Sequence, residues 1–223
     1  MAANYENTMK TTTAITCMFL DIGGVLLTDG WNRQARKRAA TTFKLELAEM
    51  EDRHHLVFET FEKAKLTLKE YLDWVVFYRK RSFTHTQFQR FMFAQSKPYP
   101  QMLELVRKLK AKYGLKIAVV SNEARELNAY RIQKFKLDEF VDFFISSCFV
   151  HLRKPDADIF RLALDIAQAP ARHVLYIETH RCSSRSRKVW GFEASFTPIT
   201  SPPAPSWLRS DCRNDEGIIH EIS

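Results

Sequence analysis

The chain has 223 residues, of which 45% are hydrophobic and 27% charged, and its net charge at pH 7 is +8. This length and composition exclude a disordered chain, a collagen-like repeat and a small disulfide scaffold, and they suit one α/β domain with an insertion or two small domains. No apolar run approaches the roughly 18 residues of a membrane span, and the widely spaced cysteines indicate neither a zinc site nor a disulfide framework. We therefore expect a soluble, cytoplasmic protein with no membrane partner.

Half of the positive charge comes from one stretch near the C-terminus. Residues 179–213 hold six Lys or Arg and two Asp or Glu, which supplies +4 of the +8. The remaining charges are close to balance, and no predicted helix carries a continuous basic stripe of the kind that binds nucleic acid. The sequence therefore predicts no nucleic-acid partner.

The predicted elements alternate between strands and helices. Residues 15–20 form a short apolar run that ends at Asp21 and two glycines, which is typical of a buried parallel strand opening onto a loop. Apolar runs predict further strands at 115–120, 141–145 and 174–177, and amphipathic patterns predict helices at 100–113, 123–134 and 156–167. This alternation predicts an α/β fold with a doubly wound parallel sheet.

A helical block interrupts this alternation after the first strand. Residues 32–95 contain neither Gly nor Pro, and Thr67 with Glu70 forms a capping box ahead of an apolar helix face. We expect an α/β core of residues 1–30 and 99–223 and an inserted helical cap of residues 31–98. We also expect the cap aromatics to pack between helices, and His54 and His55 to lie on solvated surface.

Polar residues follow three of the predicted strands. Asp21, the pair Ser121-Asn122 and Glu178 stand at strand ends, and Lys154 stands at the start of a helix. Because the carboxyl ends of neighbouring parallel strands share one crevice, these side chains should meet there. A carboxylate pair suits Mg²⁺, amides at a helix start suit a phosphate, and lysine adds a positive charge.

Four motifs in this order resemble the haloacid dehalogenase-like (HAD) hydrolases. They are D-I-G-G-V-L at 21–26, V-V-S-N at 119–122, R-K-P-D at 153–156 and L-Y-I-E at 175–178, and the resemblance covers residues 15–178. It implies a Rossmann-like HAD core and the small helical cap of the subgroup whose cap follows the first motif. The activity it implies is hydrolysis of a phosphate monoester on a small phosphorylated metabolite.

The resemblance also implies roles for individual residues. Asp21 would be the nucleophile that forms an aspartyl-phosphate, and Lys154 would stabilise the charge of the transferring phosphoryl group. Ser121 and Asn122 would bind that phosphoryl group.

The implied cofactor is Mg²⁺, and two departures from the family pattern affect its site and the chemistry. The metal would be held by Asp21, the backbone carbonyl of Gly23 and Glu178. Phosphatases of the family usually carry a second Asp at the position of Gly23, where general acid–base help contributes about 10²- to 10⁴-fold in rate. A second acid commonly follows at the position of Thr179, so Glu178 alone would supply a metal-binding side chain from that motif.

These departures leave two alternatives open. Loss of both acids is compatible with a non-catalytic relative that binds a phosphorylated ligand or a partner. Dehalogenase members also lack the second Asp, so hydrolysis of a 2-haloacid is a further enzymatic possibility. The sequence identifies neither the substrate nor the oligomeric state.

The residue pattern changes abruptly at Thr179. Residues 180–212 hold four of the eight prolines and no amphipathic helix, where the HAD fold has one more helix and one more strand. Back-translated codons read one nucleotide earlier permit an amphipathic helix, a Gly-Leu-Gly turn and an apolar strand that rejoin the chain at Arg213. We hypothesise that two compensating frameshifts, near codons 179 and 212, produced this stretch. Coding DNA that cannot yield those elements would contradict the hypothesis.

Overall fold

The computed structural model describes residues 14–178, 194–195 and 218–222. Within them, six strands form one sheet in the order β3-β2-β1-β4-β6-β5. The four parallel strands are β1 (Cys17–Leu20), β2 (Lys116–Ser121), β3 (Phe143–Ser146) and β4 (Val174–Glu178). Strand β6 (Ile218–Ile222) pairs antiparallel with β4, and β5 (Ala194–Ser195) pairs antiparallel with β6. The predicted doubly wound parallel sheet is confirmed.

The rest of the stretch from 179 to 212 lies outside the described residues, so the frameshift hypothesis stays a prediction. No helix in the described part of the chain has both the length and the apolarity needed to cross a membrane.

Helices cover both faces of the sheet. Successive strand residues point to opposite faces. Met18 and Leu20 therefore join the core beneath α5 (Pro100–Tyr113), whereas Phe19 joins the core beneath α8 (Ala157–Ala167). Helix α5 has the predicted bounds, because Pro100 suits the first turn and Gly114 ends the helix with φ of 64°. Helix α6 (Arg125–Lys134), the short α7 (Ser147–Val150) and two 3₁₀ turns, Leu137–Glu139 and Ala171–His173, complete the connections.

The helical block has a hydrophobic core, which also includes Ala124 and Leu127 at the start of α6. The block comprises α1 (Arg33–Phe43), α2 (Leu47–Glu62), α3 (Leu68–Val75) and α4 (His85–Ala94). The predicted capping box of Thr67 and Glu70 is present at the start of α3. Most of its aromatic rings pack together as expected, among them the fully buried Tyr71 and Phe88. Trp74 differs, with 55% of its surface exposed.

The two histidines of the block differ in environment. His55 is exposed, as expected. The expectation of solvated surface was wrong for His54, whose Nδ1 lies 2.8 Å from the hydroxyl of Tyr71. Burial lowers the pKa of His54 to about 3, so the imidazole is neutral and serves as a hydrogen-bonded packing residue.

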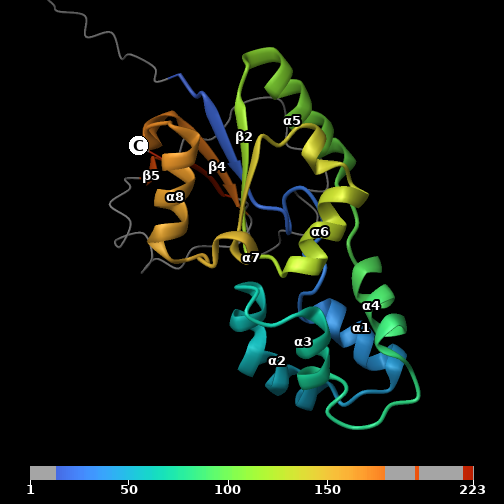
Figure 1. Ribbon diagram of the computed structural model, residues 1–223. Helices are drawn as coiled ribbons and strands as arrows, with labels where there is room; N and C mark the ends of the chain where they lie inside the picture. The colour runs from blue at the N-terminus through green and yellow to red at the C-terminus, as the bar shows by residue number, and fades with distance from the viewer. Residues whose placement is uncertain (1–13, 179–193, 196–217, 223) are drawn as a thin grey trace, which may run out of the picture.

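The helical block lies against the loops that follow the parallel strands (Figure 1). Arg153 Nε lies 2.5 Å from Glu62 Oε2 at the end of α2, and the Ser147 hydroxyl donates to the Glu62 carbonyl at 2.8 Å. At the start of α3, the Leu68 amide donates to Glu126 Oε1, also at 2.8 Å. These contacts hold the block over the carboxyl edge of the sheet, where the predicted site residues emerge.

Candidate functional site

The strand register brings the predicted residues to one level. Leu20 lies opposite Val119 on one side and Ile177 on the other, so Asp21 and Glu178 leave the sheet side by side. Ser121 follows one residue further along β2. Because β1 lies between β2 and β4, its end is the point at which the chain connections diverge to either side, and ligands bind at such points.

Asp21 is buried, with an exposed fraction of 6%. Its Oδ1 accepts hydrogen bonds from the Ser121 hydroxyl at 2.6 Å and from the Ile22 amide at 2.8 Å. Its Oδ2 lies 3.2 Å from Lys154 Nζ. The carboxylate is therefore held by a hydroxyl and an amide at one oxygen and faces an ammonium at the other.

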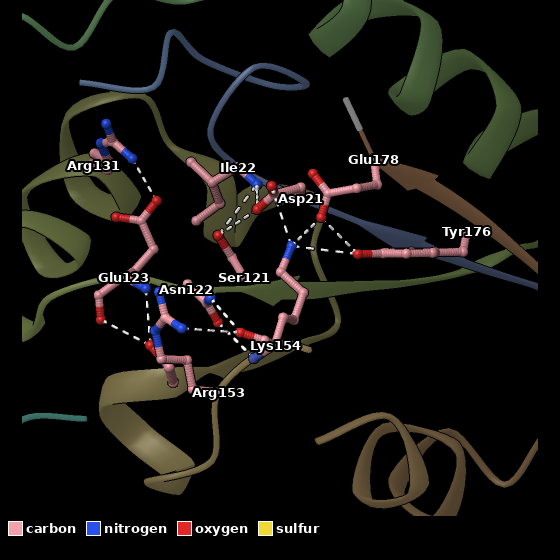
Figure 2. A network of polar contacts seen from close by, with 11 residues as sticks. Asp21, Ile22, Ser121, Asn122, Glu123, Arg131, Arg153, Lys154, Tyr176 and Glu178 are labelled. Carbon is pink, nitrogen blue, oxygen red and sulfur yellow. Dashed lines mark hydrogen bonds and ion pairs between the residues drawn. The ribbon is translucent and has the colours of Figure 1, made fainter. Parts of the chain in front are cut away.

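Lys154 reaches two carboxylates at once. Its Nζ contacts Glu178 Oε2 as well as Asp21, as Figure 2 shows. The Asn122 side chain holds the backbone of this lysine, since its amide donates to the Lys154 carbonyl at 2.9 Å and its oxygen accepts from the Lys154 amide at 2.8 Å. The structure thus brings together the strand-end residues that the sequence singled out. The Asn122 side chain holds the loop that carries Lys154.

Burial sets the charge balance of the site. It raises the pKa of Asp21 to about 7; Lys154 opposes this rise, and Glu178 adds to it. Burial alone would lower the pKa of Lys154, but the adjoining carboxylates hold it well above its usual value, so the ammonium stays charged. Above about pH 7, two carboxylates therefore share one ammonium, which leaves an excess of negative charge.

This donor set fits a magnesium ion. Mg²⁺ favours hard oxygen ligands and is commonly held by one or two carboxylates together with water and substrate phosphate. Within the described ranges, no three His, Cys, Asp or Glu side chains gather as a metal-binding group, so side-chain binding here depends on Asp21 and Glu178. The Gly23 carbonyl, two residues after Asp21, is the backbone ligand that the sequence suggested.

The carboxylate of Asp29 lies beside Gly23. A Cβ atom at position 23 would lie 3.3 Å from Asp29 Oδ1. That oxygen is buried without a hydrogen-bond partner among the described residues, whereas Asp29 Oδ2 accepts from Asn32 Nδ2 at 3.0 Å. An Asp side chain at position 23 would therefore lie next to the carboxylate of Asp29, which comes from later in the same loop. Sequence reasoning missed Asp29 because only the turn of the loop brings it back.

Tyr176 was also missed. Its hydroxyl donates to Glu178 Oε2 at 2.8 Å and lies 3.3 Å from Lys154 Nζ. The sequence pattern indicates only a buried strand residue at this position. One signal could have identified it, because residues two apart on a strand point to the same face, which places Tyr176 beneath Glu178.

A buried ion pair lies beside the loop after β2, next to Ser121 and Asn122. Arg131 contacts Glu123, donates to the Ser96 hydroxyl at 3.0 Å and donates to the Thr28 carbonyl at 3.2 Å. Thr28 and Ser96 lie on the two connections to the helical block. Gly30 packs against the same guanidinium, since a Cβ there would lie 1.7 Å from Arg131 Nη2. Figure 2 shows Arg131 in contact with Glu123. Through the hydrogen bonds to Ser96 and Thr28, the pair joins the loop after β2 to both connections.

Comparisons with known proteins bear on the family and on the fold. A family model described as haloacid dehalogenase-like hydrolase matches residues 15–178. A search of curated proteins gives no match. Among solved structures, a HAD family enzyme from Bacteroides thetaiotaomicron, in complex with magnesium and inorganic phosphate, is similar with a TM-score of 0.65 and 18% identity over 88% of this chain and 100% of that one.

Two further structures share the fold. A predicted HAD-like hydrolase from Porphyromonas gingivalis has a TM-score of 0.63 and 18% identity, over 87% of this chain and 97% of that one. The L-2-haloacid dehalogenase from Xanthobacter autotrophicus, with chloropropionic acid covalently bound, has a TM-score of 0.56 and 15% identity, over 79% and 75%.

Proposed function

Since the chain belongs to the haloacid dehalogenase-like hydrolases, we propose that it is a Mg²⁺-dependent phosphatase acting on a small phosphorylated metabolite. One observation carries this proposal. The Asp21 carboxylate faces the Ser121 hydroxyl, the Lys154 ammonium and the Glu178 carboxylate at the carboxyl edge of a parallel sheet. A nucleophile, phosphoryl-binding groups and a pair of metal-binding carboxylates are the parts that phosphoryl transfer requires.

The proposed reaction has two steps at Asp21. A carboxylate oxygen attacks phosphorus while the ester P–O bond breaks, and the departing alcohol oxygen takes a proton from water. A second water then hydrolyses the aspartyl-phosphate, which releases inorganic phosphate and restores the carboxylate. Bound Mg²⁺ would offset the repulsion between carboxylate and phosphate.

The neighbouring groups hold the phosphoryl group during these steps. We assign the Ser121 hydroxyl and the backbone amide of Asn122 to its oxygens, and Lys154 to the charge that develops on them. The two hydrogen bonds from the Asn122 side chain support a further role in keeping Lys154 in place. Gly23 supplies no acid, so water takes part in the proton transfers.

The helical block of residues 31–98 is proposed to act as a cap over the site of the core, residues 1–30 and 99–223. Its contacts with the loops of the site support this arrangement, above all the ion pair between Glu62 and Arg153, which directly precedes Lys154. Side chains of the cap would then select the metabolite.

A 2-haloacid dehalogenase is the second candidate, and Gly23 favours it because dehalogenases of the family lack the second Asp. Mg²⁺-dependent release of phosphate from p-nitrophenyl phosphate, abolished by Asp21→Asn, supports the phosphatase. Halide release from 2-chloropropionate without metal supports the dehalogenase instead. A folded protein with neither activity would be the ligand- or partner-binding relative, and the proposed function would be wrong.

A further inference from the structure

The hydroxyl of Tyr176 lies where the two charged partners of Asp21 meet. It donates to Glu178 Oε2 at 2.8 Å, and Lys154 Nζ lies 3.3 Å away (Figure 2). A tyrosine hydroxyl has one donor and can also accept. It can therefore donate to the carboxylate and accept from the ammonium at the same time, and so fix both groups relative to Asp21.

The ring of Tyr176 is a rigid support for that hydroxyl. Only 8% of the residue is exposed, and the ring packs edge-to-face on Phe160 of α8, with centroids 5.3 Å apart and an angle of 79°. Its backbone belongs to β4, which is paired on both sides, with β1 and with β6.

Glu178 needs such support more than an aspartate would. Its side chain has one more rotatable bond than Asp, and ordering that bond costs conformational entropy. Its carboxylate also lies beside the carboxylate of Asp21, and both contact the Lys154 ammonium. In the proposed function Glu178 is the only side chain from its motif that holds metal, because Thr179 follows it.

We infer that Tyr176 is a positioning residue for the Mg²⁺ site, holding Glu178 in its metal-binding orientation and Lys154 beside Asp21. This inference rests on the proposed function, in which Glu178 binds the metal. It goes beyond that function by adding a residue that touches neither the phosphoryl group nor the metal.

The test is the Mg²⁺ affinity of Tyr176→Phe, measured by calorimetric titration of the full chain with MgCl₂ and no substrate. The phenyl ring keeps its packing on Phe160, and only the hydroxyl is lost. Removing a hydrogen-bond partner of a metal-binding carboxylate typically weakens metal binding about 10- to 100-fold. We expect a Kd for Mg²⁺ raised by about 10-fold or more, and a melting curve without Mg²⁺ that remains cooperative.

Two comparisons separate positioning from a general structural effect. Tyr113→Phe, at an exposed position at the end of α5, should leave the Kd for Mg²⁺ unchanged. In a Glu178→Gln background, titrated at millimolar Mg²⁺, the further change Tyr176→Phe should weaken binding much less than it does in the natural chain. An equal loss in both backgrounds would show that Tyr176 does not act through Glu178.

Two other outcomes of the titration would overturn the inference. If the natural chain binds Mg²⁺ and Tyr176→Phe binds it equally well, the inference fails and the proposed function stands. If the natural chain binds no Mg²⁺, both fail together.

Discussion

Replacing Asp21 by asparagine should make the folded protein more stable at neutral and alkaline pH while abolishing hydrolysis. Burial raises the pKa of Asp21 from 3.8 to about 7. Between these values the folded chain holds a proton on Asp21 that the unfolded chain has lost. The stability contributed by this group is therefore complete below pH 3.8 and is lost as the pH rises to about 7. At about 1.4 kcal/mol per pH unit, the total loss is about 4 kcal/mol.

Asparagine is neutral throughout this range, and its carbonyl oxygen can still accept the hydrogen bond from Ser121. The free energy of unfolding of Asp21→Asn minus that of the natural chain should therefore grow by up to about 4 kcal/mol across the window and level off above pH 7. Urea denaturation of both proteins in Mg²⁺-free buffer, from pH 5 to pH 8, covers the upper two pH units of this window and should show about 3 kcal/mol of the growth.

The control is Asp165→Asn, which removes an exposed carboxylate on α8 and should give a small difference with little dependence on pH. A difference for Asp21→Asn that stays flat, or that shrinks as the pH rises, would refute the argument that burial beside Glu178 penalises the charged carboxylate. Added Mg²⁺ should reduce the difference, because the cation stabilises the natural chain and has a weaker site in the variant.

Three further predictions follow from the same contacts. Phosphatase activity should rise with pH through about 7, because the nucleophile must be deprotonated, and higher Mg²⁺ should move this limb to lower pH in a pH–rate profile. Asn122→Ala removes both hydrogen bonds to the Lys154 backbone and should lower kcat by up to about 100-fold, with a nearly unchanged Tm. Arg36→Ala leaves the buried Glu51 unpaired and should cost about 3–5 kcal/mol in urea denaturation, whereas Arg36→Met with Glu51→Leu should cost far less.

Local patterns in the sequence were sufficient for the parallel strands, for the long helices of the core and for the place where the strand ends meet. The capping box at Thr67 and the Pro100 and Gly114 bounds of α5 depend on residues only a few positions apart, so they can be identified before any tertiary contact is known. The strand ends at Asp21 and Glu178 were expected to meet because parallel strands share one edge, and the register confirms that they do.

Tertiary structure decided which side chains touch within that site. Tyr176 followed the pattern of a buried strand residue, and only the folded chain shows its hydroxyl on Glu178. The same holds for Asp29 beside Gly23 and for the side chain of Asn122, which holds the Lys154 backbone. The physical reason is one of range. Periodicity and capping arise from neighbours within a few residues, whereas a hydrogen bond across the crevice requires two distant segments to place their atoms within about 3 Å of each other.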